Sequence, residues 1–101
     1  MKKIECVIRP EKLLLVEQAL RNEHVGGMTI SEVKGFGLQR KEARSKIKLE
    51  IYAMEVEVER ILRAIRVAAF TGDIGDGKIA VLPLDNVIRV RTQEQGAKAL
   101  V

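Results

Sequence analysis

The sequence predicts a ferredoxin-like α+β sandwich, in which an antiparallel sheet carries two helices on one face. Three observations support this fold class. The 101 residues are enough for one domain, short runs of alternating polarity mark strands, and two longer runs place apolar residues at helical spacing. In chain order these segments give β-α-β-β-α-β, followed by a short C-terminal strand. Residues 1–101 are therefore predicted to form a single domain.

The first half of the chain contains a strand, a helix and a second strand. Residues 2–9 alternate in polarity and form the first predicted strand. Pro10 suits the first position of a helix that extends to about Asn22. Residues 29–36 are rich in residues that favour β-structure and form the second strand. The apolar side chains expected in the core from this half are Ile4, Cys6, Ile8, Leu13, Val16 and Leu20.

The second half begins with a cleanly alternating strand at residues 46–53. The polar residues 38–45 link it to the second strand, which predicts an antiparallel hairpin. A helix is expected at 56–70, a strand at 78–84 and a last short strand at 87–91. The apolar stripe of that helix consists of Val58, Ile61, Leu62, Ile65 and Ala69.

Composition limits the class of partner. The net charge of +4 suits an anionic ligand but is too small and scattered to indicate a nucleic-acid partner. Cys6 is the only cysteine, which excludes an intrachain disulfide and argues against structural zinc. We see no signal peptide and no apolar run long enough to span a membrane, so we expect a cytoplasmic protein without direct membrane insertion.

The stretch Thr71–Lys78 has glycines at positions 72, 75 and 77 directly before a lysine. Such a loop lets backbone N–H groups converge and adds a mobile cation, which suits a polyphosphate. It matches the first seven positions of a Walker A loop, but Ile79 stands where Ser or Thr would hold magnesium, and the loop follows a helix instead of preceding one. A plain glycine-rich turn explains it equally well. Arg89 and Arg91, which would share one face of the last strand, favour an anion site.

Several segments, spread over nearly the whole chain, match one known pattern. They are Met1–Glu5, Ile8–Pro10, Gly27–Thr29, Glu32–Gly37, Thr71–Gly72, Ile74–Ile79 and Ile88–Thr92. On these residues the chain resembles the PII nitrogen-regulatory signal-transduction proteins. The resemblance implies a regulator and not an enzyme. It also implies a homotrimer with ATP or ADP bound in clefts between subunits, which controls nitrogen or related carbon metabolism through contacts with target proteins.

The resemblance also assigns residues to the nucleotide site. The glycine loop would cradle the phosphates, paired arginines would reach them across the cleft, and the hairpin base would approach the phosphates and magnesium. The nucleotide-binding residues would be Thr29, Gly35, Gly37, Gln39, Tyr52, Gly75, Asp76, Gly77, Lys78, Arg89 and Arg91. Magnesium would be held by bound ATP, with Gln39 as the protein contact, and no catalytic residue or protein-held metal is implied. Lys46, with Gln39, stands where the family binds 2-oxoglutarate.

The chain departs from the family in the long T-loop that contacts partner proteins. Only Leu38–Ser45 join the two strands, so roughly a dozen residues are missing, including the tyrosine that some members have uridylylated. Leu38 also replaces an arginine that the family uses toward phosphate. This shortening argues against 2-oxoglutarate binding and against the usual transporter and enzyme partners. The remaining candidates for a partner contact are Arg40, Lys41 and Arg44 at the basic hairpin tip.

Two other classes of function, a nucleotide hydrolase and an RNA-binding module, fit the residues less well than a nucleotide-sensing regulator. Weak nucleotide hydrolysis is disfavoured because the chain has no dedicated general base beside a magnesium-binding Ser or Thr. A ferredoxin-like RNA-binding module needs aromatic platforms on its central strands. The chain has only Phe36, Tyr52 and Phe70 as aromatics, so both alternatives rank below the regulator.

Overall fold

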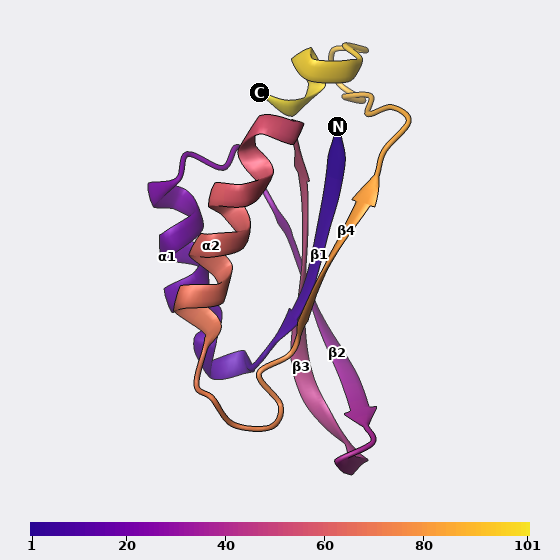
Figure 1. The fold of residues 1–101 in the computed structure, drawn as a ribbon. Coiled ribbons are helices and arrows are strands. Elements are labelled where there is room, and N and C mark those ends of the chain that lie inside the picture. The colour runs from indigo at the N-terminus through magenta and orange to yellow at the C-terminus, as the bar shows by residue number, and fades with distance from the viewer.

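The computed structural model describes residues 1–101, apart from the side chain of Arg40. Its elements are β1 (Lys2–Ile8), α1 (Leu13–Asn22), β2 (Thr29–Gly37), β3 (Arg40–Ala53), α2 (Val58–Ala69) and β4 (Lys78–Pro83). Short 3₁₀ turns lead into the helices at Pro10–Lys12 and Glu55–Glu57, and a third, Gly96–Leu100, lies near the C-terminus. In Figure 1 both helices cover one face of the sheet. The N-terminus and the C-terminal segment lie at one end, and the loop before β4 lies at the other.

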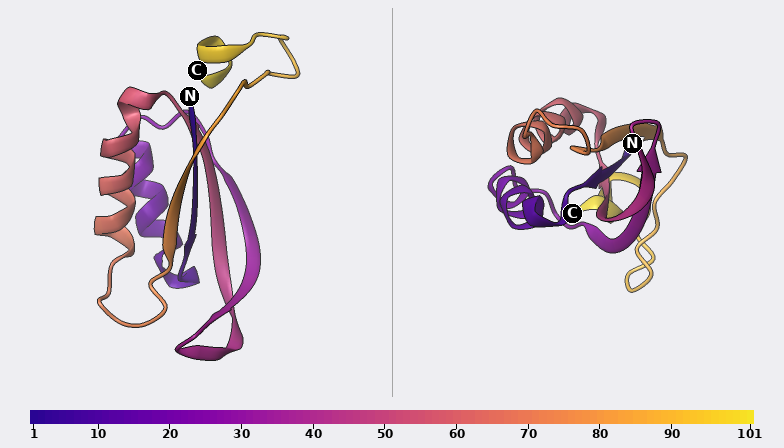
Figure 2. Two further views of the ribbon diagram at one scale, coloured as in Figure 1. Left: turned by 45° about the vertical axis from the view of Figure 1, so that its right-hand side comes forward. Right: turned by 90° about the horizontal axis from the view of Figure 1, so that it is seen from below.

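The sheet confirms the predicted ferredoxin-like topology. Its strand order is β2-β3-β1-β4, and every neighbouring pair is antiparallel. β1 and β3 are central, and their register places Cys6 opposite Leu49 and Ile4 opposite Ile51. Figure 2 shows the two layers edge-on, with the β2–β3 hairpin reaching past the end of β1.

The core lies between the helices and the sheet and is aliphatic, as predicted. Its buried side chains are Ile4, Cys6, Ile8, Val16, Leu20, Ile47, Leu49, Ile51, Ala53, Val58, Ile61, Ile65 and Ala69. Each fully buried Leu, Ile or Val contributes roughly 1.5–3 kcal/mol to folding. Among the side chains that the structure describes, none that is polar or charged is fully buried. In the described residues, neither helix has the length and hydropathy needed to cross a bilayer.

The opposite, open face of the sheet carries paired charges at its centre. Lys3 Nζ lies 2.9 Å from Glu5 Oε1 and 3.0 Å from Glu50 Oε2, and Lys48 Nζ lies 3.7 Å from Glu5 Oε1. The hydrogen bonds with Glu5 and then Glu50 raise the pKa of Lys3, and the bond from Lys3 lowers the pKa of Glu5. These groups are solvent-accessible, so the pairs fix side-chain positions more than they stabilise the fold. The face is therefore already charge-compensated.

The hairpin differs from its prediction. β3 begins at Arg40 instead of residue 46, and only the turn Leu38–Gln39 links it to β2. The pairing is irregular between Gly35 and Gly37. Residues 40–45 show no strand-like alternation of apolar and polar side chains. β1 pairs with β3 only from Ile47 onward, so this distal part of the hairpin has no face against the core.

The predicted C-terminal strand was wrong. Residues 87–91, whose backbone the structure describes, form one isolated bridge, Ile88↔Gln95, and a turn follows. β4 ends at Pro83, which has no N–H to continue a ladder. The segment after it therefore folds back on the residues that follow it instead of joining the sheet.

Candidate functional site

The loop between α2 and β4 is held against β1 by glycine geometry. Gly77 has φ +102°, and a Cβ placed on it would lie 1.7 Å from the carbonyl oxygen of Val7. Only glycine satisfies both conditions. Gly72 and Gly75 also have positive φ, +91° and +103°. This close approach fixes the start of β4, where Lys78 pairs with Val7.

The Asp76 carboxylate organises the loop from inside. It accepts hydrogen bonds from the N–H groups of Thr71 (2.8 Å) and Gly72 (2.9 Å) and from the Thr71 hydroxyl. Arg9 Nε, at the end of β1, adds a charged contact at 3.0 Å. The Thr71 hydroxyl, the two N–H groups and Arg9 hold the pKa of Asp76 well below its usual range. The ionised side chain is thus engaged by the loop itself.

Two cations hold carbonyl groups of the same loop. Arg9 Nη2 donates to the carbonyl oxygen of Ile74 at 2.8 Å, and Lys46 Nζ donates to that of Gly75 at 2.6 Å. Meanwhile the backbone N–H groups of Ile74, Gly75 and Asp76 find no acceptor within the described part of the chain. Successive N–H groups without internal acceptors are what anion-binding loops present.

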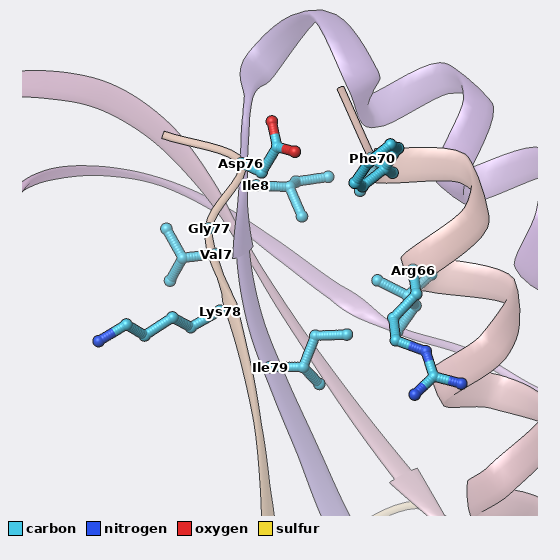
Figure 3. A pocket seen from close by; sticks show the side chains of 10 residues that line it. Val7, Ile8, Arg66, Phe70, Asp76, Gly77, Lys78 and Ile79 are labelled. Carbon is cyan, nitrogen blue, oxygen red and sulfur yellow. The ribbon is translucent and has the colours of Figure 1, made fainter. Parts of the chain in front are cut away.

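The open face beside this loop carries a lysine outside the charge-compensated centre of the sheet. Lys78 is exposed and makes no ion pair with any residue that the structure describes. Lys78 and Lys48 both pair with Val7, one on each side, so they share a row and a face of the sheet. Figure 3 shows the Lys78 and Val7 side chains directed to one side of the sheet and Ile79 to the other. The loop's N–H groups and Lys78 suit a phosphate chemically.

The helix side of the same loop is different. A hollow of about 390 Å³ lies between α2 and β4, and its lining includes Ile8, Ile65, Phe70, Ile79 and Arg66. It is mainly apolar, and the Lys78 side chain points away from it. The phosphate chemistry therefore belongs to the open face and not to this hollow.

A second group of predicted residues lies at the other end of the molecule. Thr29, Tyr52 and Arg89 line a hollow of about 290 Å³ together with the C-terminal residues. Arg89 is already engaged there, by the Glu94 carboxylate and a backbone carbonyl. Arg91 is exposed in the turn that replaces the predicted strand, so the expected paired-arginine face is not formed.

The hairpin carries the remaining predicted residues. Gly35 and Gly37 lie in β2, and a Cβ on either would meet no described atom within 4 Å. The chain's own packing thus gives no reason for these glycines, unlike Gly77. Gln39 is exposed in the turn. The partner-contact candidates Lys41 and Arg44 are exposed in β3, while the Arg40 side chain lies outside the described residues.

One chain does not bring the two groups together. Lys78 pairs with Val7 and Tyr52 pairs with Lys3. They are therefore four positions apart along β1, roughly 13 Å. The Arg89 segment lies beyond the N-terminal end of β1, opposite the glycine loop. A site that uses both Lys78 and Arg89 for one phosphate chain therefore cannot form within a single copy in this conformation.

Sequence reasoning missed three residues that shape these sites: Arg9, Thr71 and Glu94. Arg9 is 67 positions from Asp76 in the sequence, and no spacing rule connects them. The strand order could have found Arg9, because antiparallel neighbours place the end of β1 at the start of β4. The contacts of Thr71 with Asp76 and of Glu94 with Arg89 each join residues five positions apart in the sequence. They depend on turns that the sequence pattern did not predict.

Comparison with known proteins gives one consistent result. The family model described as "Nitrogen regulatory protein P-II" matches residues 1–94. Proteins of that name from Azospirillum brasilense and Synechocystis sp. are each 42% identical to the chain over 112 residues, covering 99% of this chain and all of theirs. One from Bradyrhizobium diazoefficiens is 44% identical over the same span. The aligned span exceeds the 101 residues present here, so these relatives carry residues that this chain lacks.

The solved structures agree. A crystal structure of Arabidopsis thaliana PII bound to citrate superposes with a TM-score of 0.89 at 42% sequence identity. The match covers 98% of this chain and 88% of the plant chain. Both the sequence and the fold therefore match over essentially the full length.

Proposed function

The chain belongs to the nitrogen regulatory protein P-II family and is a signal-transduction regulator, not an enzyme; on that premise we propose that it binds ATP or ADP between the subunits of a cytoplasmic homotrimer. The single observation that carries this proposal is the separation of the two groups of site residues. The glycine loop with Lys78 lies at one end of the molecule, and Thr29, Tyr52 and Arg89 lie at the other. A neighbouring copy that brings its Arg89 end against this glycine loop would complete the site.

The chemistry at the glycine loop supports a polyphosphate ligand. Three consecutive N–H groups lack internal acceptors, and Lys78 has no described carboxylate partner. Phosphate binds to such donors through charge-assisted hydrogen bonds. The Arabidopsis relative is described as bound to citrate, a small polyanion, which is consistent with an anionic effector here.

The open face supports assembly of copies. Its centre is charge-compensated by Lys3, Glu5, Lys48 and Glu50, so another copy can pack there without leaving an unpaired charge. Tyr52 on the same face is 49% exposed. A 101-residue chain also gains stability from oligomerisation, because it buries a limited share of its own surface.

The hairpin is the proposed output to an unidentified target protein, a transporter or metabolic enzyme by analogy with the family. Its exposed tip combines Lys41 and Arg44 with Leu38, which is 99% exposed. Lys46 connects the hairpin to the glycine loop through its bond to the Gly75 carbonyl. A nucleotide that moved this loop would therefore act directly on the base of the hairpin.

2-Oxoglutarate is not part of the proposal. Gln39 lies in a two-residue turn, and Lys46 is bonded to the loop carbonyl. A turn of this length supplies little backbone to enclose a second anion. Magnesium would arrive with ATP, with Gln39 as its candidate protein contact.

Calorimetric titration with ATP and ADP, with and without magnesium, tests the proposal. Lys78→Ala and Arg89→Ala should each weaken ATP binding by roughly tenfold to a hundredfold, because each removes a charge-assisted contact. Arg63→Ala, which removes an exposed arginine from α2, is the control and should bind as the wild type does. Unchanged affinity in both site variants would show that the nucleotide binds elsewhere or not at all.

A further inference from the structure

Arg89 has an anionic partner within its own chain. Its Nη1 lies 3.4 Å from the Glu94 Oε1, and its Nη2 donates to the carbonyl oxygen of Ala99 at 3.3 Å. The side chains of Arg89 and Glu94 are only 28% and 41% exposed. The guanidinium that the proposed function assigns to a phosphate is thus shared by a carboxylate and a carbonyl of the C-terminal segment.

The backbone places Glu94 at this position. The Arg89 N–H donates to the Glu94 carbonyl at 2.9 Å, and the Gln93 N–H donates to the Arg89 carbonyl at 2.8 Å. The Gly96 N–H closes the segment on Val87 at 3.0 Å. These bonds hold the two residues opposite each other, so the turn brings their side chains within reach of one another.

We propose that Glu94 is a specificity-determining residue of the nucleotide site, an internal competitor that a ligand phosphate must displace from Arg89. The inference rests on the proposed function, in which Arg89 contacts phosphate. It follows that Glu94 lowers the affinity for every ligand that uses Arg89. Glu94 has no effect on a ligand without phosphate, such as adenosine. It therefore reduces the difference in affinity between ligands that carry phosphate and ligands that do not.

The test is titration of wild type, Glu94→Gln and the control Glu59→Gln with ATP and with adenosine at low ionic strength. Glu59 is an exposed carboxylate in α2, so its variant makes the same charge change away from the site. Glu94→Gln should bind ATP about two- to fivefold more tightly, the range expected for a partly exposed ion pair. Adenosine affinity should stay unchanged, and Glu59→Gln should match the wild type for both ligands.

A mutant cycle with Arg89→Ala isolates the mechanism. In the Arg89→Ala background, Glu94→Gln should no longer alter ATP affinity, because the competed group is absent. If ATP binds and Arg89→Ala weakens it, but Glu94→Gln leaves binding unchanged or weaker, Glu94 is not a competitor and the inference is overturned. The proposed site would survive that result. If the wild type does not bind ATP, or Arg89→Ala has no effect, the proposed role of Arg89 fails first.

Discussion

Replacing Gly77 with alanine should destabilise the protein through two backbone effects that the structure separates. The residue has φ +102°, a conformation that costs an L-residue roughly 1–2 kcal/mol. Its new Cβ would lie 1.7 Å from the Val7 carbonyl oxygen and 2.8 Å from its carbon. Both are backbone atoms, so no side-chain rotation can relieve the contact. The loop would have to move away from β1 and lose the first rung of the β1–β4 pairing, about 1 kcal/mol more.

Together these effects give a loss of about 2–3 kcal/mol in the free energy of unfolding. That loss corresponds to a fall in Tm on the order of 10–20 °C for a domain of this size. Thermal unfolding followed by circular dichroism, at one fixed protein concentration, measures it. The concentration must be fixed because assembly would contribute to the apparent stability.

Gly35→Ala is the matched control for this experiment. A Cβ at Gly35 meets no described atom within 4 Å, and its φ is not in the left-handed range. Alanine there should leave stability unchanged or raise it by up to about 1 kcal/mol, through the unfolded chain. Equal Tm values for the two variants would refute the argument that the Gly77 backbone contact anchors the loop.

Three further predictions concern Asp76, Cys6 and 2-oxoglutarate. The folded-state pKa of Asp76 is depressed, so its contribution to stability should be present above about pH 4 and decrease as the pH falls through the lowered value. Asp76→Asn should remove that dependence and speed hydrogen exchange at Thr71 and Gly72, while unchanged exchange would contradict it. Cys6 is 1% exposed and burial raises its pKa to about 11. A thiol reagent at pH 8 should therefore react only after unfolding, and about 3 kcal/mol of stability should be lost between about pH 8.5 and 11 in the wild type but not in Cys6→Ala. 2-Oxoglutarate should not bind tightly in the presence of saturating magnesium-ATP, and tight binding by calorimetry would show that the two-residue turn does build its pocket.

The sequence predicted those parts of the fold that bury apolar side chains. β1, α1 and α2 were found within a few residues, because Ile4, Val16, Ile61 and similar side chains impose period two or 3.6 on their neighbours. β2 and β4 were found equally closely from their residue types, although neither places a side chain in the buried core. The antiparallel hairpin was predicted, but the extension of β3 over residues 40–45 was not, because these residues face no core and backbone pairing to β2 leaves no trace in residue polarity. Residues 87–91 have a strand-like pattern but no strand to pair with.

The sequence also predicted part of the candidate site, and the rest became visible only in the folded chain. The importance of the glycines at 72, 75 and 77 was predicted from sequence, and their backbone angles now give the reason. The role of the Asp76 carboxylate inside the loop, and that of Arg9 in holding it, depends on contacts that only the folded chain defines. Whether the other predicted residues contact nucleotide stays a prediction, because it depends on a second copy.

Complementation between two variants with weakened ATP binding tests the shared site most directly. Lys78→Ala and Arg89→Ala chains would be unfolded together, refolded as mixed oligomers and titrated with ATP. If each site takes Lys78 from one copy and Arg89 from its neighbour, random mixing restores about one quarter of the sites to wild-type affinity. If both residues serve a site within one chain, no mixed oligomer contains an intact site, and the mixture should bind as weakly as its two components.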